Sequence, residues 1–190
     1  MQRNRRNIVA AGRRHLVEAG YHRLSLEQVA ADAGVTRVTI YRQFTSKLGL
    51  LDAIAEDLAQ RAEVVTGMQA AAAADHPDAF RMMVSELCRF WDTDPDLFRR
   101  LISLAAVDPE AHHVVSSREQ WRYEQISTFV HRLAAGGRLR TPFEVEQAVA
   151  TVGATTSFPT CDEMATRLQC GLGQLDQLLI ALLASVVHLD

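Results

Sequence analysis

Residues 24–47 read LSLEQVAADAGVTRVTIYRQFTSK and show two short helical segments joined by a tight turn. Ser25 is expected to cap the first segment, with Gln28 three residues later as its reciprocal partner in a capping box. Gly34 tolerates positive φ and is expected at the end of that helix. Thr36 is expected to cap the second segment. Two short helices about a glycine-containing turn are typical of a helix-turn-helix, whose second helix enters the DNA major groove.

The charge of the chain differs between its two parts. Residues 1–47 contain nine Arg and Lys residues and three acidic ones, a net charge of +6, whereas residues 48–190 carry a net charge of −9. A basic segment attracts DNA phosphates through counterion release, and an acidic one is repelled by them. We therefore predict a DNA-binding domain at 1–47 and a second domain at 48–190.

Residues 8–54 resemble the N-terminal domain of the tetracycline-repressor (TetR) family of bacterial transcription regulators. The spacing of the matching residues is unbroken, and these residues are Ile8, Ala10, Ala11, Gly20, Tyr21, Leu26, Val29, Ala30, Ala33, Gly34, Val35, Thr36, Ile40, Tyr41, Phe44, Ser46, Lys47, Leu50 and Leu51. Three positions depart from the usual family pattern: Val38 replaces Gly or Ala, Gln43 replaces His or Tyr, and Gly49 replaces Glu. The first two lie on or beside the reading helix, so they bear on the DNA sequence preference and not on the fold.

The second helix of the motif, at about 36–44, carries the residues that we expect to read bases. Arg37 lies in its first turn and can pair bidentately with guanine O6 and N7. Thr39 is short enough to meet a base edge or a thymine methyl, and Val38 can touch a thymine methyl. We therefore expect these three side chains to contribute to sequence preference.

A second group of side chains is expected to contact the DNA backbone. The resemblance implies phosphate contacts from the hydroxyls of Thr36 and Tyr41. Lys47 is the only lysine in the chain, and it lies at a helix start, where free backbone N–H groups also favour an anion. The complete expected set of DNA-contacting residues is Ser25, Thr36, Arg37, Val38, Thr39, Tyr41, Arg42, Gln43 and Lys47. The alternative interpretation treats Arg37, Arg42 and Lys47 as a solvated polar face.

The basic run Arg3-Asn4-Arg5-Arg6 precedes the first expected helix, at about 7–19. The resemblance implies an arm that reaches toward the DNA backbone or the minor groove, and the alternative is an unstructured basic tail. No apolar segment of signal-peptide length follows the run, so we do not expect secretion. The apolar stretches are also shorter than the roughly 20 residues that a membrane span needs, and no membrane partner is expected.

The rest of the chain is predicted to be helical, which makes the fold all-α with about nine or ten helices. The helix that starts at Ser46 shows apolar residues at steps of three or four, and it is expected to continue through the alanine run at 70–74 as one lever of about 27 residues. Asp94-Pro95 and Asp108-Pro109 each place an N-cap before proline. Thr141-Pro142-Phe143-Glu144 is expected to add a capping box with proline at the first helical position.

Two helices of the second domain are expected to form a homodimer. The helix at about 172–187 has an unusually wide apolar face, and the helix at about 142–155 carries small residues that allow close approach between helices. A two-fold protein reads a palindrome in double-stranded DNA, with half-sites about 34–36 Å apart or a multiple of that. The alternative interpretation places both helices in the core of one monomer.

The helices at about 77–135 are rich in methionine and aromatic residues, which suit a cavity for a small apolar or aromatic effector molecule. Glu124 lies in this region and has the charge to neutralise a cationic ligand. The candidate ligand-binding residues are Met83, Cys88, Trp91, Trp121, Glu124 and Phe129. The alternative interpretation is that the apolar members form hydrophobic core and that Glu124 faces water.

The sequence contains no pattern that predicts catalysis, a metal site or a cofactor. His112 and His113 diverge on a helix, and the three cysteines form no CxxC pair, which indicates a reducing cytoplasm. We therefore predict a DNA-binding transcriptional regulator, most simply a repressor that a small-molecule ligand releases from a palindromic operator. Two alternatives stay open: a TetR-like DNA-binding protein without an inducer, acting as an architectural or cell-cycle factor, and a transcriptional activator.

Overall fold

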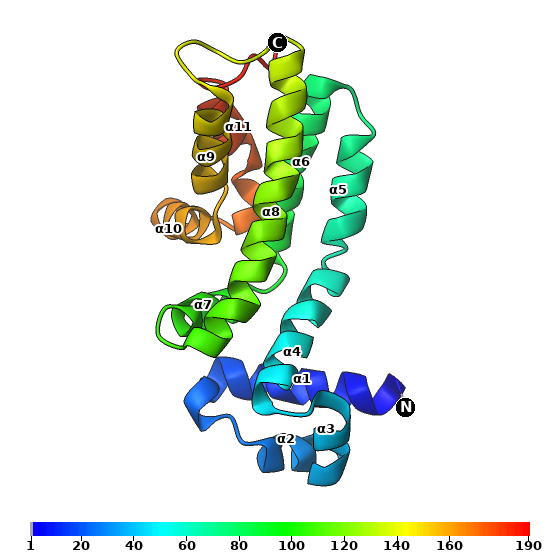
Figure 1. Ribbon diagram of the computed structural model, residues 1–190. Helices are drawn as coiled ribbons and strands as arrows, with labels where there is room; N and C mark the ends of the chain where they lie inside the picture. Colours follow the sequence, from blue (N-terminus) through cyan, green and yellow to red (C-terminus); the bar gives the residue numbers. More distant parts are fainter. Residues whose placement is uncertain (1) are drawn as a thin grey trace. The chain divides into compact units, whose positions relative to one another are not determined.

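The structure is a computed structural model that describes residues 2–190. These residues form an all-helical fold (Figure 1). The helices within the described range, two of them short 3-10 helices, are α1 (Gln2–Ala19), η1 (Tyr21–Arg23), α2 (Leu26–Asp32), α3 (Arg37–Phe44), α4 (Lys47–Arg61), α5 (Val64–Ala72), α6 (His76–Asp92), α7 (Pro95–Ala105), α8 (Pro109–Ala135), α9 (Val145–Thr155), α10 (Phe158–Leu168), η2 (Leu172–Gln174) and α11 (Asp176–Leu183). The predicted all-α class is confirmed, and the α-helices of this range number eleven where about nine or ten were expected.

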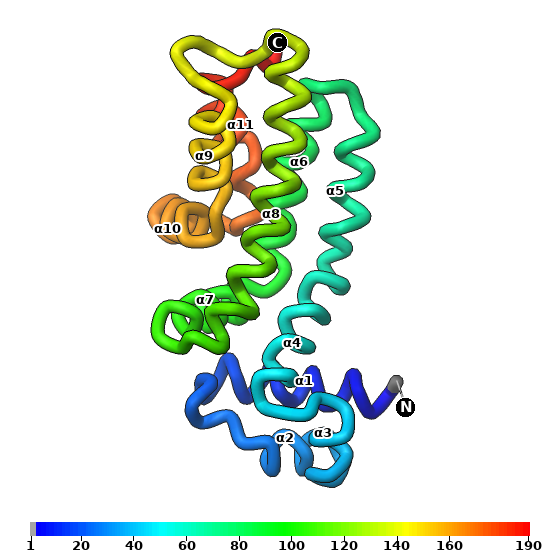
Figure 2. Tube along the Cα trace, viewed as in Figure 1, coloured from blue at the N-terminus to red at the C-terminus, as the bar shows by residue number. Residues whose placement is uncertain are grey.

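The chain folds into two compact units, each made of two stretches of sequence. Unit 1 contains the described residues up to Arg61 together with 94–118, and unit 2 contains 62–93 together with 119–190. The colours of Figure 2 allow these stretches to be followed along the chain. Unit 1 includes α4, α7 and the first part of α8 in addition to α1, η1, α2 and α3. The predicted functional division after Lys47 stays a prediction.

The core of unit 1 is formed by apolar side chains from all of its first four helices. Helix α1 packs against α2, α4 and α7, and α3 packs against α2 and α4. The side chains that are fully buried here include Ile8, Leu16, Val29, Ile40, Leu50, Leu51, Ile54 and Leu58. This core holds α3 by one side, through Ile40 and Phe44, and leaves its other side to solvent.

The turn between α2 and α3 has the expected geometry. Gly34 has a φ of 67°, a left-handed conformation that costs glycine little. Its N–H donates to the carbonyl of Ala31 at 3.1 Å, and the N–H of Val35 donates to the carbonyl of Ala30 at 3.0 Å. These two bonds are those of a Schellman motif. They end α2 sharply and direct the chain into α3.

The caps of the two helices differ. The hydroxyl of Thr36 accepts a hydrogen bond from the N–H of Thr39 at 3.3 Å, which confirms the predicted cap of α3. Ser25 has the extended conformation of an N-cap, but its side chain makes no capping bond. The predicted capping box between Ser25 and Gln28 is therefore wrong. Gln28 is exposed, so water can accept hydrogen bonds from the first N–H groups of α2 in place of a capping side chain.

The expected continuous helix after Ser46 is also wrong. Helix α4 ends at Arg61 and α5 begins at Val64, with Glu63 between them in the left-handed region at a φ of 52°. Helix α4 packs on α1 within unit 1, whereas α5 packs on α6 within unit 2. The break allows each helix to bury its own apolar face.

The helix starts predicted from Asp-Pro pairs are confirmed. Asp94 accepts a hydrogen bond from the N–H of Leu97 at 3.4 Å, and Asp108 accepts one from the N–H of Ala111 at 2.9 Å. Each bond satisfies one of the free amide groups of a first helical turn. Helix α8 then runs to Ala135, the predicted end.

The start predicted at Thr141-Pro142 lies too early. Helix α9 begins at Val145, and its N-cap is Glu144. The backbone N–H of Glu144 donates to the side chain of Gln147 at 3.0 Å, and the two residues form a capping box. This reciprocal pair satisfies amide groups at 144–147, so the helix starts there.

The expected helix at 172–187 is divided into η2, α11 and an irregular end, where Val187 forms an antiparallel bridge with Leu139. Asp92 of α6 accepts a hydrogen bond from the N–H of Leu172 at 3.0 Å, which holds η2 against α6. Most of the apolar side chains of this segment are buried in unit 2: Leu172, Leu175, Leu179, Leu183, Val186 and Val187. Leu178 and Leu182 remain 39% and 45% exposed. The predicted wide apolar face is therefore largely core of a single chain.

Candidate nucleic-acid interface

The basic run at residues 3–6 is the first part of α1, which begins at Gln2. The alternative of an unstructured tail is therefore wrong, because these residues are helical. The contact with the DNA backbone or the minor groove that the resemblance implies stays a prediction. The guanidinium of Arg5 lies over the ring of Phe44, 4.7 Å from its centroid, which links the first turns of α1 to the end of α3. A folded, positively charged turn thus lies beside the predicted reading helix.

Helix α3 presents the predicted DNA-contacting residues on its solvent side. Val38 is 74% exposed, an exposure that suits contact with a thymine methyl. The other members of the predicted set on this helix and its cap are exposed or half-buried: Thr36, Arg37, Thr39, Tyr41, Arg42 and Gln43. The structure therefore brings the larger part of the predicted set onto one helix surface.

Arg37 is held by two neighbours. One terminal amino group of its guanidinium donates to the carboxylate of Glu27 on α2, and the other donates to the hydroxyl of Tyr41 at 3.1 Å. The hydrogen bond to Tyr41, with the charge of Glu27, raises the pKa of Arg37. All three side chains are exposed, so these contacts are weak in water and can be exchanged for others.

Glu27 was not in the predicted set. The signal that could have found it is its charge, since it is the single acidic residue of the first turn of α2. A helix-turn-helix places this turn near the first turn of the second helix, where Arg37 lies. The pair therefore illustrates a contact across the turn, at a separation of ten residues.

Lys47 lies partly covered at the start of α4. Its ammonium group is 4.3 Å from the centroid of the Tyr21 ring. Burial lowers the pKa of Lys47, an effect that the charge of Asp108 partly offsets. The first turn of α4 has its own cap, because the hydroxyl of Ser46 accepts a hydrogen bond from the N–H of Gly49 at 3.0 Å. The phosphate-contacting role of Lys47 stays a prediction.

Gly49, one of the three departures from the family pattern, has a structural reason. A Cβ atom at this position would lie 1.9 Å from the carbonyl oxygen of Phe44. No other residue fits without a shift of the backbone. Gly49 therefore permits the close approach between the end of α3 and the first turn of α4.

A hollow opens on the same surface as the reading residues. Its volume is about 320 Å³, and it is lined by Asn4, Val38, Thr39, Arg42 and Gln43. The side-chain oxygen Oε1 of Gln43 is buried and has no hydrogen-bond partner within residues 2–190. The surface of unit 1 thus combines exposed cations with a hollow that is lined by Val38 and four polar residues. Hydrogen-bonding groups beside an apolar group are what the recognition of a base edge requires.

The predicted ligand-binding residues all belong to unit 2. Four of them are buried in its core: Met83, Cys88, Trp91 and Phe129. Trp121 is half-buried, and Glu124 is exposed and accepts a hydrogen bond from Gln120 at 3.1 Å. Burial raises the pKa of the Cys88 thiol to about 12. The structure brings the apolar members together in the interior and leaves Glu124 at the surface, so their ligand-binding role stays a prediction.

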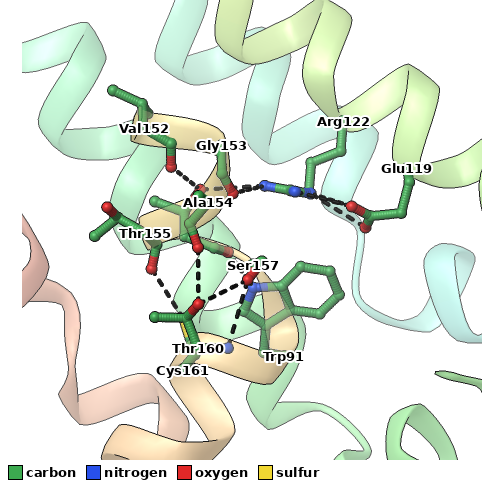
Figure 3. A network of polar contacts seen from close by, with 11 residues as sticks. Trp91, Glu119, Arg122, Val152, Gly153, Ala154, Thr155, Ser157, Thr160 and Cys161 are labelled. Carbon is green, nitrogen blue, oxygen red and sulfur yellow. Dashed lines mark hydrogen bonds and ion pairs between the residues drawn. The ribbon is translucent and has the colours of Figure 1, made fainter. Parts of the chain in front are cut away.

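Sequence reasoning missed a buried polar network beside these residues (Figure 3). Arg122 of α8 has a side chain that is 3% exposed. It donates to the carbonyl of Gly153 at 3.1 Å, to the hydroxyl of Thr156 at 3.2 Å, and to Glu119 at 2.8 Å. The indole N–H of Trp91 donates to the carbonyl of Thr156 at 2.9 Å. These bonds attach α6 and α8 to the C-terminal end of α9.

No cluster of three or more His, Cys, Asp or Glu side chains in the described part of the chain is arranged to hold a metal ion. Within the same residues, none of the helices combines the length and apolar character that crossing a membrane requires.

Comparison with known proteins gives a family for the first part of the chain. Residues 8–54 match the family described as bacterial regulatory proteins, tetR family. No curated protein matches this chain in sequence. The matched residues run from α1 through α2 and α3 into α4, as Figure 1 shows.

Solved structures match almost the whole chain. A TetR transcription regulator from Haloarcula marismortui is 16% identical, with a TM-score of 0.78 over 99% of this chain and 100% of that chain. The transcriptional regulator FadR from Bacillus subtilis, in complex with stearoyl-CoA, is 19% identical, with a TM-score of 0.77 over 96% of this chain and 99% of that chain. The fatty acid degradation regulator FadR from Bacillus halodurans is 17% identical, with a TM-score of 0.77 over 95% and 94%. At these identities the likeness shows a common fold.

Proposed function

We propose that this chain, a DNA-binding transcriptional regulator that belongs to the TetR family through residues 8–54, is a dimeric repressor of a palindromic operator. In this proposal a small molecule bound in unit 2 releases it from DNA. The observation that carries the proposal is the exposed side of α3, where Arg37, Val38 and Arg42 face solvent on a helix that the core holds from behind. The net charge of +6 over residues 1–47 adds attraction for the phosphates.

Base reading is assigned to Arg37 in particular. Its guanidinium has the planar, forked geometry that pairs with guanine O6 and N7. The contacts of that guanidinium with Glu27 and Tyr41 are exposed and weak in water, so a guanine can replace them with little loss. The phosphate contacts are assigned to Thr36, Tyr41 and Lys47, as the family resemblance implies.

Dimer formation is supported by the exposed faces of α9 and α11. Leu178 and Leu182 lie four residues apart on one side of α11 and remain exposed. Ala150 and Ala154 have the same spacing on α9 and are also exposed, whereas Gly153 is buried against Tyr123 within the protomer. These two small apolar stripes suit close packing against a second copy. A two-fold dimer places two copies of α3 in successive major grooves.

An effector of apolar character is supported by the interior of unit 2. Its aromatic and methionine side chains can adapt to a hydrophobic molecule. The FadR protein from Bacillus subtilis has this fold and binds stearoyl-CoA in its solved structure. The effector acts only through its difference in affinity between the DNA-binding arrangement of the dimer and another one.

The experiment that tests DNA reading is a selection of bound sequences from random duplex DNA at moderate salt. We expect the wild-type protein to enrich an inverted repeat. Arg37→Ala is expected to lower specific binding by about 1–3 kcal/mol and to relax the preference at one base pair per half-site. Arg37→Lys is the matched control, because it keeps the charge and loses the bidentate geometry. Unchanged affinity and preference in both variants would remove Arg37 as a base reader.

The effector is tested on the operator that this selection provides. A panel of acyl-CoA esters, which join an apolar chain to a charged nucleotide, and of uncharged apolar molecules is screened for thermal stabilisation of the protein and for release of the operator. We expect the active compounds to do both, since a ligand that favours one state shifts both equilibria. A panel that neither stabilises the protein nor releases DNA would favour a regulator without an inducer.

A further inference from the structure

We propose that Asn4, in the first turn of α1, is a base-reading residue and that it acts with Gln43 of α3 on an adenine·thymine pair in the major groove. The proposal rests on the reading of DNA by α3. It adds α1 as a second helix of the reading surface. It assigns the first turn of α1 to the major groove, where the resemblance implied an arm near the DNA backbone or the minor groove.

Asn4 shares one hollow with the reading helix. The other four residues that line this hollow of about 320 Å³ are Val38, Thr39, Arg42 and Gln43, all from α3. Asn4 itself is helical and exposed. The contact between Arg5 and the Phe44 ring joins the same turn of α1 to the end of α3. The position of Asn4 beside α3 is therefore set by the folded unit.

The lining of the hollow has the chemistry of an adenine·thymine edge. The carboxamide of an Asn or Gln can pair bidentately with adenine N6 and N7, and the thymine methyl takes an apolar contact. The single adenine edge is shared between two carboxamides: the amide N–H of Asn4 donates to N7, and the Oε1 of Gln43 accepts from N6. Val38 supplies the exposed apolar group. A guanine·cytosine pair presents no methyl group in the major groove, so it matches only part of this lining.

Gln43 gives an independent sign that the hollow receives a polar partner. Its Oε1 atom is buried and unpaired within residues 2–190, although buried polar atoms are normally hydrogen-bonded. The N6 amino group of adenine is a donor, and rotation of the Gln43 carboxamide into the hollow would pair the two. A base edge in the hollow would thus satisfy an atom that the protein leaves without a partner.

The test uses the full chain and compares the wild type with Asn4→Ala in selection from random duplex DNA. Asn7→Ala is the matched control, because Asn7 is exposed on the same helix and lies outside the set that lines the hollow. We expect the wild type and Asn7→Ala to enrich the same inverted repeat. Asn4→Ala is expected to lose the preference for one adenine·thymine pair per half-site, to bind the wild-type operator about tenfold more weakly, and to keep its salt dependence.

A second measurement identifies the groove. The adenine at that position is replaced by 7-deazaadenine, which lacks the N7 acceptor in the major groove and keeps the minor-groove edge. We expect this change to weaken the wild-type protein about tenfold and to add little to the effect of Asn4→Ala.

The inference is wrong if Asn4→Ala enriches the wild-type operator with unchanged affinity, or if its only effect is a smaller salt dependence, which would indicate a phosphate contact. It is also wrong if 7-deazaadenine has no effect on the wild type. In each of these cases the wild-type protein still enriches an operator, so the proposed function is not contradicted. A wild-type protein that enriches no operator overturns both proposals.

Discussion

Arg37 of unit 1 and Arg122 of unit 2 lie in opposite environments. In unit 1, Arg37 is 54% exposed, and its partners on α2 and α3 are exposed as well. In unit 2, Arg122 is 3% exposed and donates to Glu119 and to two oxygen atoms at the end of α9. An exposed guanidinium can exchange its partners for a base at little cost in free energy. A buried guanidinium cannot move away without leaving its buried acceptors without a hydrogen-bond donor. The environment of an arginine, more than its presence, therefore separates a binding role from a structural one.

The largest expected effect comes from removal of the buried arginine. Arg122→Ala leaves the carbonyl of Gly153 and the hydroxyl of Thr156 without their donor, and we expect the free energy of unfolding to fall by about 3 kcal/mol. Arg37→Ala, its exposed counterpart, is expected to change this free energy by less than about 0.5 kcal/mol. Urea denaturation of both variants measures the difference. Equal losses of unfolding free energy in the two variants would contradict the difference between a buried and an exposed arginine.

A smaller loss of stability is expected from substitution of Gly49, whose close contact with the backbone of Phe44 positions the reading helix α3. In Gly49→Ala the new methyl group meets the Phe44 carbonyl, and we expect a loss of about 2 kcal/mol from overpacking. Gly136→Ala is the matched control, since its new Cβ would lie no closer than 3.5 Å to a neighbour. Urea denaturation compares the two variants. A Gly49→Ala protein as stable as the control would show that the close contact between Gly49 and the Phe44 carbonyl does not determine how α3 and α4 pack.

Unit 1 also contains a buried carboxylate, Asp94, which pairs with Arg13 and Arg61 and should behave like the interior of unit 2. Asp94 is 5% exposed and accepts a hydrogen bond from Arg13 at 2.7 Å. Burial opposes its ionisation, but the hydrogen bonds from Arg13 and from the N–H of Leu97, together with the charges of Arg13 and Arg61, outweigh burial and hold the pKa of Asp94 below its ordinary value. Arg13 is about a third exposed, so solvent screens part of its effect. We expect Asp94→Asn to lower the free energy of unfolding by about 1–2 kcal/mol at neutral pH.

The pH dependence of this pair has a definite sign. Because the pKa of Asp94 is lower in the folded state, its contribution is present above the unfolded value of about 4 and is lost as the pH falls through the folded value. The wild type and Asp94→Asn should therefore differ in urea midpoint at pH 7 and converge in acid. A difference that stays constant below about pH 4 would show that the charge of Asp94 is not its cause.

The smallest effect is expected at the exposed surface of unit 1. Lys47→Ala removes one cation near the phosphates, and we expect weaker binding to all sequences and a salt slope lower by about one. Arg167→Ala, an exposed arginine of unit 2, is expected to leave the slope unchanged. Operator binding over a range of salt concentrations measures both. An unaltered slope in Lys47→Ala would mean that its contact with Tyr21 persists on DNA and that it meets no phosphate.

The helix-turn-helix could be predicted from sequence because its signals are local. Gly34 and Thr36 act within a few residues through a turn and a cap, and both have the expected conformation. The starts at Asp94 and Asp108 follow the same principle, since an Asp side chain bonds an amide three residues away. The solvent side of α3 follows from helical period once Ile40 and Phe44 are placed in the core.

Two of the incorrect predictions depend on partners far along the chain. The break at Glu63 follows from the packing of α4 and α5 in different units. The sequence of these two helices does not indicate that packing. The leucines of the last segment show helical spacing, but contact with α6 converts most of them into core. The capping box at Ser25 has the right residues and lacks the bond, so the residue spacing alone does not form it.

The sequence by itself determined the all-helical class, the helix-turn-helix, and the charge that separates residues 1–47 from the rest, because periodicity, caps and net charge are properties of neighbouring residues. Only the tertiary structure decided that Asn4 lies beside α3, that Glu27 holds Arg37, and that Arg122 serves the end of α9. Each of these contacts joins separate helices, and its geometry exists only after the apolar cores have packed. The reading surface is therefore encoded locally, while the groups that orient and complete it are assembled by the fold.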